Sequence, residues 1–420
     1  MSSEPRTYRV EELISMGLLE IGDGYRAKNS ELAETGIPFA RAGNINDGFK
    51  FDDADFFPES ELSRVGAKVS RPGDVVFTSK GTVGRFALVE QHSQRFVYSP
   101  QLCFWRSLDS GNILPEYLYY WMSSQEFLHQ VSYLKGQTDM ADYVSLRDQR
   151  RMAVTIPSMQ QQLHVVECLK PIDERITLLR ETNVTLEAIA QALFKSWFVD
   201  FDPVRAKVEG FEPESMDTAT AALFPDSFEE SELGLLPKGW EIKTLMDLLV
   251  LQRGFDLPAS ARTKGLYPII AASGPSGTHS EARSKGPSVV TGRSGVLGRV
   301  FLELEDFWPL NTTLWVKEFR AATPCYAYEL LRLIDFASFN AGSAVPSLNR
   351  NHIHGLKYII PDSSCIAAFE SIALPLHERV RANEKQASTL TKLRDTLLPR
   401  LISGQIRLPE AEELVEETCA

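Results

Sequence analysis

The clearest pattern in the chain is a helical spacing of apolar residues that occurs twice. Between residues 172 and 197, and again between 376 and 401, apolar side chains recur in alternating steps of four and three. Such steps align side chains along one seam of an α-helix, as in a coiled coil. We therefore predict two long helices that pair through these seams. The seam positions are Ile172, Ile176, Leu179, Asn183, Leu186 and Leu193 in the first stretch and Leu376, Val380, Asn383, Leu390 and Leu397 in the second.

Each seam contains one asparagine, Asn183 or Asn383. A polar seam residue lowers stability while it fixes the register, so both are interpreted as alignment devices. Pro171 and Pro375 are expected in the first turns of the helices, where a missing N–H is tolerated. The stretch from 172 to 197 would form a rigid rod about 39 Å long. Two plain core helices are the alternative interpretation.

The remainder of the chain repeats in step with the seams. The sequence IPSMQQQ at 156–162 corresponds to IPDSSCI at 360–366, and the glycine turn at 81–85 corresponds to the one at 295–299. Self-similarity over so long a period indicates two diverged copies of one module. Around each glycine turn the pattern predicts strand, turn and strand, and a helical stretch follows in each copy.

The expected fold is therefore mixed α/β (α+β), with two globular parts that are each followed by a long helix. Residues 201–236 carry nine acidic and only two basic residues, together with three prolines, and are expected to form an exposed connector. Aromatic residues at 194–201 are expected to pack in a core or to dock on the second module or another subunit. The predicted boundaries are 1–157, 158–200, 201–236, 237–361, 362–406 and an acidic tail at 407–420.

Composition and charge narrow the class of protein. The chain has 420 residues, of which 43% are hydrophobic and 24% charged, as in ordinary globular proteins. The net charge of −12 is concentrated in the connector and the tail, so it does not exclude a locally basic surface. No apolar stretch approaches the roughly 18 residues of a membrane span, and the N-terminus lacks a signal-peptide pattern. We expect a cytoplasmic protein without a membrane partner.

Catalytic and metal-binding motifs are sparse in the sequence. Five cysteines lie far apart, and His352 and His354 have no third ligand candidate nearby, so no metal site is expected. No phosphate-binding loop and no amino-methyltransferase tetrapeptide occurs. Asp226, Glu241 and Lys243 have a spacing that is compatible with a magnesium-dependent nuclease.

The two glycine turns carry side chains that are suited to nucleic acid. Arginine recognises guanine, glutamine and asparagine recognise adenine, and lysine mostly contacts phosphate. Lys80, Thr82, Arg85 and Gln101 surround the first turn, and Arg293, Ser294, Arg299 and Asn311 surround the second. Isolated side chains of this kind are usually solvated loop residues, and their recurrence at equivalent places leaves both a binding role and plain solvated loops open.

Taken in order, and twice, these motifs resemble the specificity subunits of type I restriction–modification systems. The resemblance covers essentially the full chain. It rests on TSKGTVGR and TGRSGVLGR, on Ser145-Leu146 and Ser347-Leu348 before Ile-Pro, on FKSWFVDFDPVRAK, and on LPKGWE.

The resemblance implies a non-catalytic subunit in which each globular part is a target recognition domain for one half of a split sequence in double-stranded DNA. It implies that the two helices pack as an antiparallel coiled coil, set the gap between the half-sites and bind two methyltransferase subunits. A separate motor-nuclease restriction subunit would complete the complex. No cofactor is expected in this chain, whereas S-adenosylmethionine, ATP and magnesium are expected on the partner subunits.

The resemblance also places the DNA contacts in matched loops of the two modules. A second loop precedes each long helix, at 136–140 and 342–344. The implied DNA-binding residues are Lys80, Thr82, Arg85, Gln101, Gln137 and Thr138 in the first module and Arg293, Ser294, Arg299, Asn311 and Ser343 in the second.

Two other functions stay open at this point. One is a stand-alone magnesium-dependent nuclease that uses Asp226, Glu241 and Lys243. The other is a coiled-coil adaptor that never contacts DNA.

Overall fold

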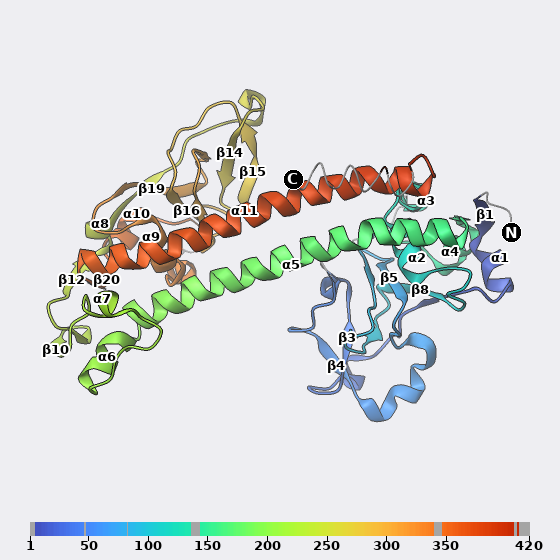
Figure 1. Ribbon diagram of the computed structural model, residues 1–420, viewed down its shortest axis with the longest axis horizontal. Helices are drawn as coiled ribbons and strands as arrows, with labels where there is room; N and C mark the ends of the chain where they lie inside the picture. Colours follow the sequence, from blue (N-terminus) through green and yellow to red (C-terminus); the bar gives the residue numbers. More distant parts are fainter. Residues whose placement is uncertain are drawn as a thin grey trace. The chain divides into compact units, whose positions relative to one another are not determined.

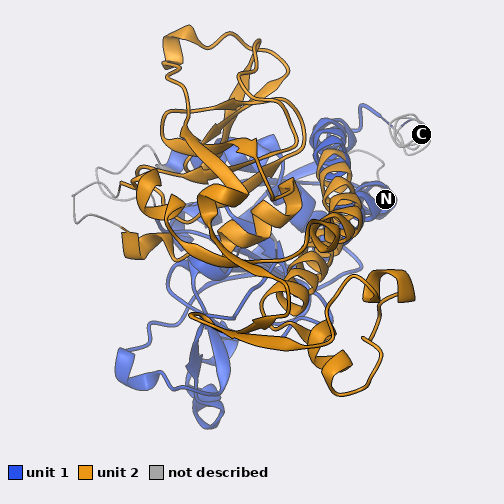
Figure 2. Ribbon diagram, turned by 90° about the vertical axis from the view of Figure 1, so that its left-hand side faces the viewer, with its two compact units in different colours: residues 1–178, 386–420 blue, residues 179–385 orange. Residues whose placement is uncertain are grey.

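The computed structural model describes residues 5–45, 48–81, 83–135, 143–339, 347–406 and 410, and it divides into two compact units. Unit 1 comprises residues 1–178 and 386–420, and unit 2 comprises residues 179–385 (Figure 2). Both divisions fall inside long helices, so each unit contains one half of each. The predicted domain boundaries remain predictions.

Unit 1 is built on two small sheets and a strand pair (Figure 1). A four-stranded antiparallel sheet has the order β2 (Leu19–Asp23), β8 (Leu102–Ser107), β5 (Asp74–Thr78) and β6 (Phe86–Leu88). A three-stranded sheet has the order β4 (Asp55–Phe57), β3 (Ile37–Ala40) and β7 (Val97–Tyr98), and β1 (Arg6–Arg9) pairs with β9 (Ala153–Ile156). The short helices are α1 (Val10–Ser15), α2 (Pro115–Met122), α3 (Gln125–Lys135) and α4 (Leu146–Arg151).

Unit 2 repeats this topology strand for strand. Its four-stranded sheet has the order β13 (Leu249–Arg253), β19 (Thr313–Phe319), β16 (Ser288–Gly292) and β17 (Val300–Glu303). Its three-stranded sheet has the order β15 (Gly274–His279), β14 (Tyr267–Ala271) and β18 (Trp308–Pro309), and β12 (Glu241–Thr244) pairs with β20 (Lys357–Ile360). The equivalent helices are α8 (Leu245–Leu248), α9 (Pro324–Arg332) and α10 (Arg350–His354). The predicted internal repeat is therefore confirmed.

Two long helices, α5 (Met159–Phe198) and α11 (Ser363–Ile402), contact each other within each unit. In unit 2, Nδ2 of Asn383 donates to Oδ1 of Asn183 at 2.8 Å, while the Phe194 ring lies 5.6 Å from the Phe369 ring. Because residue numbers rise along one helix as they fall along the other, the helices run antiparallel. The two helices are in antiparallel contact and the two asparagines meet, whereas a coiled coil along the whole of both seams remains a prediction. Within the described residues, no helix combines the length and the apolar character of a membrane span.

The expectation that Pro171 and Pro375 begin the helices is wrong. Pro171 lies inside α5, and α11 likewise begins well before Pro375. A proline inside a helix costs about 3 kcal/mol. Buried side chains on the N-terminal side of each proline, Leu169 in α5 and Phe369 in α11, outweigh that cost by packing against their units.

The acidic segment is not the exposed connector that its composition predicts. It forms α6 (Asp202–Val208), α7 (Thr218–Ala221) and the hairpin β10 (Phe228–Ser231) with β11 (Gly234–Pro237). Val204, Phe224 and Leu236 are buried in the core of unit 2. The segment folds because these scattered apolar residues pack on unit 2, while most of the acids between them remain exposed.

The aromatic run at the end of α5 packs into the same core. The Phe198 ring lies 5.1 Å from the Tyr326 ring and 5.5 Å from the Phe369 ring, and the Trp197 ring lies 5.1 Å from the Phe224 ring. Of the two expectations for this run, the structure therefore supports core packing within the second module.

A buried ion pair crosses the four-stranded sheet of unit 1. Asp74 accepts hydrogen bonds from Nε of Arg106 at 2.6 Å and from Nη2 at 2.8 Å. Tyr98 donates a further hydrogen bond to Asp74, and Glu20 forms an ion pair with Arg106 at 3.0 Å. The Asp74 side chain is fully buried, so these donors replace the water that its carboxylate has lost.

Unit 2 buries a carboxylate against α11. Glu329 of α9 is 1% exposed and pairs with Arg332 at 3.2 Å, and Nε2 of His377 lies 3.9 Å from its carboxylate. Burial raises the pKa of Glu329 to about 7, although Arg332 acts in the opposite direction. Burial also lowers the pKa of His377 to about 4. Both groups therefore tend toward their neutral forms.

We expect Glu329→Gln to stabilise unit 2 more at pH 8 than at pH 4. An unfolded glutamate ionises near its ordinary pKa of 4.5, whereas the folded one ionises only near 7, so the wild type loses stability as pH rises through that window. Glutamine does not titrate. The difference in unfolding free energy between variant and wild type should rise by on the order of 3 kcal/mol from pH 4 to pH 8. Hydrogen exchange of the α9 amides measures it.

The matched control is Glu384→Gln on the same unit, because Glu384 is largely exposed and its ion pair with Arg381 is on the surface. Its effect should be small at both pH values. A flat difference for Glu329→Gln would contradict the assignment of a raised pKa.

Candidate nucleic-acid interface

In unit 1, three segments converge at the turn between β5 and β6. The backbone N–H of Ser79 donates to the carbonyl of Gln101 at 2.9 Å, and the N–H of Val144 donates to the carbonyl of Ser79 at 2.9 Å. Lys80 is exposed and forms a β-bridge with Tyr143, which is 42% exposed. The glycine turn thus lies beside Gln101, the residue that precedes β8. It also lies beside Tyr143 and Val144.

Two of the predicted contact residues hold the backbone of a neighbouring loop. The Oε1 atom of Gln101 accepts from the N–H of Ala42 at 3.1 Å, and Nη1 of Arg85 donates to the carbonyl of Ala42 at 3.3 Å. Ala42 begins a short 3-10 helix, Ala42–Asn44. Arg85 and Gln101 therefore join this loop to the glycine turn.

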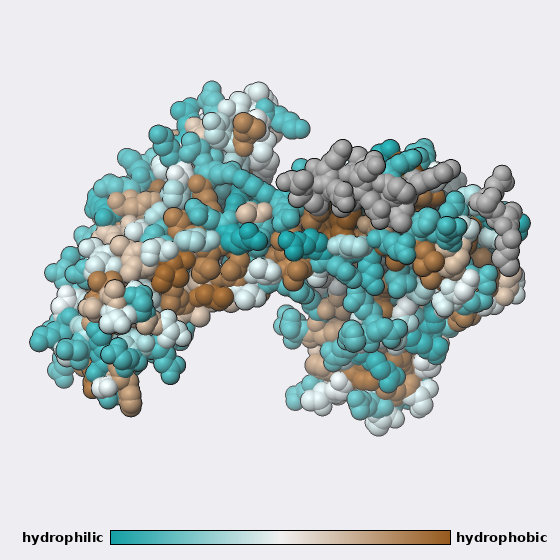
Figure 3. All heavy atoms as spheres, viewed as in Figure 1, coloured by the Kyte–Doolittle hydropathy of each residue, from teal (hydrophilic) through white to brown (hydrophobic). Residues whose placement is uncertain are grey.

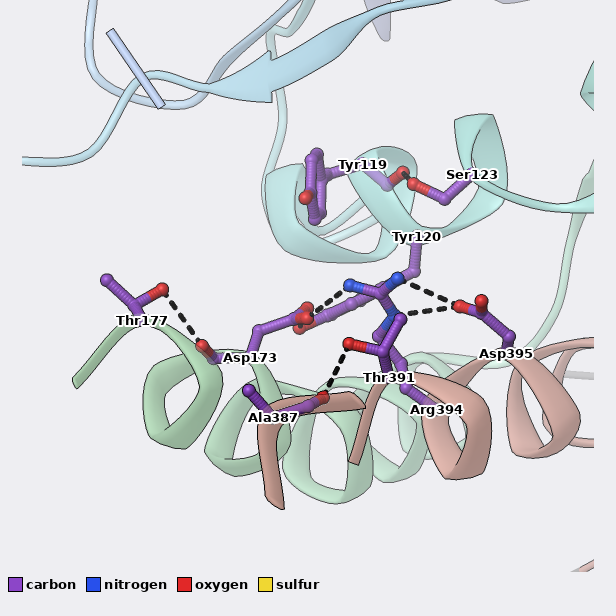
Figure 4. Close-up of polar contacts among 9 residues, drawn as sticks. All are labelled: Tyr119, Tyr120, Ser123, Asp173, Thr177, Ala387, Thr391, Arg394 and Asp395. Atoms are coloured by element: carbon purple, nitrogen blue, oxygen red, sulfur yellow. Dashed lines mark hydrogen bonds and ion pairs between the residues drawn. The ribbon is translucent and has the colours of Figure 1, made fainter. Parts of the chain in front are cut away.

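The turn of unit 1 borders a pocket of about 570 Å³ that reaches the long helices. Arg85 lies at one side, and at the other Asp173 of α5 accepts from the hydroxyl of Tyr120 at 3.0 Å and from Nη1 of Arg394 at 2.8 Å (Figure 4). Nη2 of Arg394 also pairs with Asp395 at 2.8 Å. These bonds join α2 to both long helices within unit 1.

Unit 2 presents the equivalent turn between β16 and β17. Nη1 of Arg293 donates to the carbonyl of Asn311 at 3.5 Å, and the amide of Asn311 donates to Asp256, which also pairs with Arg253 at 3.1 Å. Ser294 forms a β-bridge with Ser347, as Lys80 does with Tyr143. Arg299 is exposed, and its guanidinium donates to the carbonyl of Ser273 at 2.7 Å.

Backbone conformation explains why glycine recurs in both turns. The φ angle is +82° at Gly81 and +105° at Gly84, and it is +87° at Gly295 and +82° at Gly298. Residues with a Cβ rarely adopt these angles, so each turn needs glycine at the same two places. The same backbone therefore displays different side chains in the two units.

The structure thus gathers Lys80, Arg85 and Gln101 in unit 1 and Arg293, Ser294, Arg299 and Asn311 in unit 2. Thr82, Gln137, Thr138 and Ser343 lie outside the described residues. The assumed match of Ser145 with Ser347 is shifted by two residues, because the bridges equate Tyr143 with Ser347. Ser145 instead corresponds to Asn349, since each caps the following short helix.

Comparison with known proteins places the chain in a family. The family model for the "Type I restriction modification DNA specificity domain" matches residues 12–188. The chain is 23% identical over 381 residues to the type I restriction enzyme MjaIX specificity subunit of Methanocaldococcus jannaschii, across 84% of this chain and 82% of that protein. It is 24% identical over 441 residues to the HindI specificity subunit of Haemophilus influenzae, across 88% and 94%. The chain belongs to the type I specificity subunits.

The fold agrees with this assignment. A solved type I restriction–modification S subunit from M. genitalium superposes with a TM-score of 0.57 and 14% identity, over 95% of this specificity subunit and 96% of that chain. At this identity the likeness concerns the fold alone.

The residues of the nuclease alternative do not form a site in this specificity subunit. Lys243 is ion-paired with Glu241 on the exposed strand β12, and Asp226 accepts a hydrogen bond from Ser227. Across the part of the chain that the structure describes, no group of three metal-ligating side chains occurs. Nothing in the comparisons supports a nuclease.

Sequence reasoning missed Tyr143, Arg253 and Asp256. Tyr143 follows the second loop in the sequence, and an aromatic residue at the end of a loop is the signal that could have found it. Arg253 and Asp256 gave no such signal, because their position beside Asn311 depends on the pairing of β13 with β19. In that pairing Arg253 lies opposite Leu314.

Proposed function

We propose that this specificity subunit reads a two-part sequence in double-stranded DNA, one half with each unit. The supporting observation is that each unit has the same kind of glycine turn on its own four-stranded sheet, and the two turns carry different side chains at equivalent places. Lys80 in unit 1 corresponds to Ser294 in unit 2, because each forms a β-bridge with the residue that follows the second loop of its unit. Different donors and acceptors on one scaffold suit two different half-sites. The subunit reads DNA and leaves its modification and cleavage to other chains.

The long helices are proposed to act as the spacer and as a docking surface for two methyltransferase subunits. On the unit 2 half of α5, Val184 is 70% exposed and Ile189 is 48% exposed. Figure 3 shows hydrophobic side chains gathered along this part of the surface. Exposed apolar side chains on a helix favour a protein partner. S-adenosylmethionine, ATP and magnesium would be bound by the methyltransferase and restriction subunits, in the cytoplasm.

Exchange of one turn tests the assignment of half-sites to units. We expect a chain in which residues 80–85 are replaced by the sequence of 294–299 to change one half of the methylated DNA sequence and leave the other half unchanged. The shared glycine backbone should accept the exchange, and methylation mapping of cellular DNA with the assembled complex gives the readout.

The reciprocal exchange, with residues 294–299 replaced by those of 80–85, is the matched control and should alter only the other half. Unchanged recognition by both intact complexes would contradict the proposal. Changes in both halves at once would also contradict it.

A further inference from the structure

Unit 2 contains a pocket of about 580 Å³ at the end of β19 that lies away from the recognition turn. Residues of α8, β13, β19 and α10 line it, and α8, α10 and β19 lie together in Figure 1. Its polar lining includes Lys317, Arg350, His354, Gln252 and Asn351. Asp and Glu are absent from the residues that line it.

A β-bulge places Lys317 at this pocket. Val250 pairs with Glu318 and Leu251 pairs with Val316, so Lys317 has no partner on β13. A bulge bends its strand and redirects a side chain, and bulges are frequent next to functional sites. Here the redirected side chain is an exposed cation.

In unit 1 the residue at the equivalent position is also a cation, but it is neutralised by carboxylates of its own sheet. The equivalent residue of β8 is Arg106, opposite Asp74 of β5 and Glu20 of β2, and both carboxylates pair with it. In unit 2 the register of β16 with β19 puts Ser288 at the place of Asp74. The charge of Lys317 is therefore not neutralised by the sheet.

Arg350 and His354 add to the positive character of the pocket. Among the described residues, neither Lys317 nor Arg350 has a carboxylate within ion-pairing distance. Nε2 of His354 accepts from the N–H of Leu251 at 2.9 Å, so the remaining ring nitrogen of the neutral imidazole, Nδ1, is a donor. The pocket thus combines two cations with one buried neutral donor and lacks a counter-charge.

We propose that this pocket binds a phosphate group of the DNA backbone, an inference that rests on the proposed function. One strand connects the two sites, because Asn311 at the recognition turn precedes β19 and Lys317 lies near its end. Six residues of strand span about 20 Å. At 3.4 Å per base pair that distance covers roughly six base pairs of duplex. A phosphate bound here would fix the orientation of unit 2 on the DNA without reading its sequence.

The test is DNA binding by the assembled complex that contains Lys317→Ala and Arg350→Ala together, over a range of salt concentrations. We expect about tenfold weaker binding. We also expect a plot of log affinity against log salt concentration that is less steep by about one. The order of preference among variant target sequences should not change. Both side chains are exposed, and an unchanged melting temperature confirms that the fold is intact.

The control is Lys357→Ala, which removes one positive charge from β20 of the same unit and breaks an exposed pair with Glu232 outside the pocket lining. It should leave the salt dependence as in the wild type. An unchanged slope for the double variant would overturn the inference, and so would binding of inorganic phosphate to the pocket without any change in DNA affinity. Failure of the proposed function is a separate result, because the wild-type complex itself would then show no sequence preference.

Discussion

Replacing Asp74 with alanine is expected to lower the free energy of unfolding of unit 1 by about 3–5 kcal/mol. The change removes the carboxylate that neutralises Arg106, and the buried guanidinium then keeps Glu20 and the carbonyl of Val69 as partners. The hydroxyl of Tyr98 loses its acceptor as well. Because two units need not unfold together, the measurement is hydrogen exchange of β5 and β8 amides in the full chain.

The control for this substitution is Asp23→Ala. Asp23 forms an exposed pair with Lys68 at 2.9 Å on β2 of the same sheet. Surface pairs contribute about 0–1 kcal/mol, so protection in β5 and β8 should change little. Equal losses for the two variants would mean that burial of the Asp74–Arg106 pair does not stabilise unit 1.

Removing one heptad from each long helix is expected to shorten the DNA spacer that the complex accepts by about three base pairs. The deletions are residues 177–183 of α5 and 383–389 of α11, which take out Asn183 and Asn383 together and keep the seams in phase. Seven residues of helix correspond to about 10 Å, close to the rise of three base pairs. Methylation of a series of targets that differ only in spacer length provides the readout.

A deletion of four residues from each helix, 183–186 and 387–390, is the companion variant. It shifts the seams out of phase, so pairing and assembly should be lost. Full activity of the heptad variant on the original spacer, with the complex assembled, would refute a role of helix length in spacing. Both variants follow from the proposed function.

The repeat and the helical seams could be predicted because they rest on local periodicity. Apolar steps of four and three at 172–197 already define one helix face, and the glycine pairs mark a turn that only a few conformations satisfy. Contacts between segments that are distant in the chain were beyond such reasoning. The pair of Asp74 and Arg106 depends on strand register, which neither residue reveals alone.

Proline and acidic composition misled the prediction for a shared physical reason. Both are local signals. Pro171 alone indicates the start of a helix, and the acidic composition of 201–236 alone indicates an open connector. Tertiary burial outweighed both, through Leu169 ahead of the proline and Phe224 within the acidic segment. The sequence predicted which turns form the candidate site. It did not predict that Arg85 and Gln101 hydrogen-bond to the backbone of Ala42, which only the structure shows.

The division of the long helices between the units has a consequence for synthesis on the ribosome. Unit 2 is one unbroken stretch, 179–385, whereas unit 1 needs residues from both ends of the chain. While the polypeptide emerges, Asp173 is made early but its partner Arg394 only near the finish. The part that is translated first is therefore the last to be completed, and in newly made protein Asp173 of α5 lacks its arginine partner until termination is close.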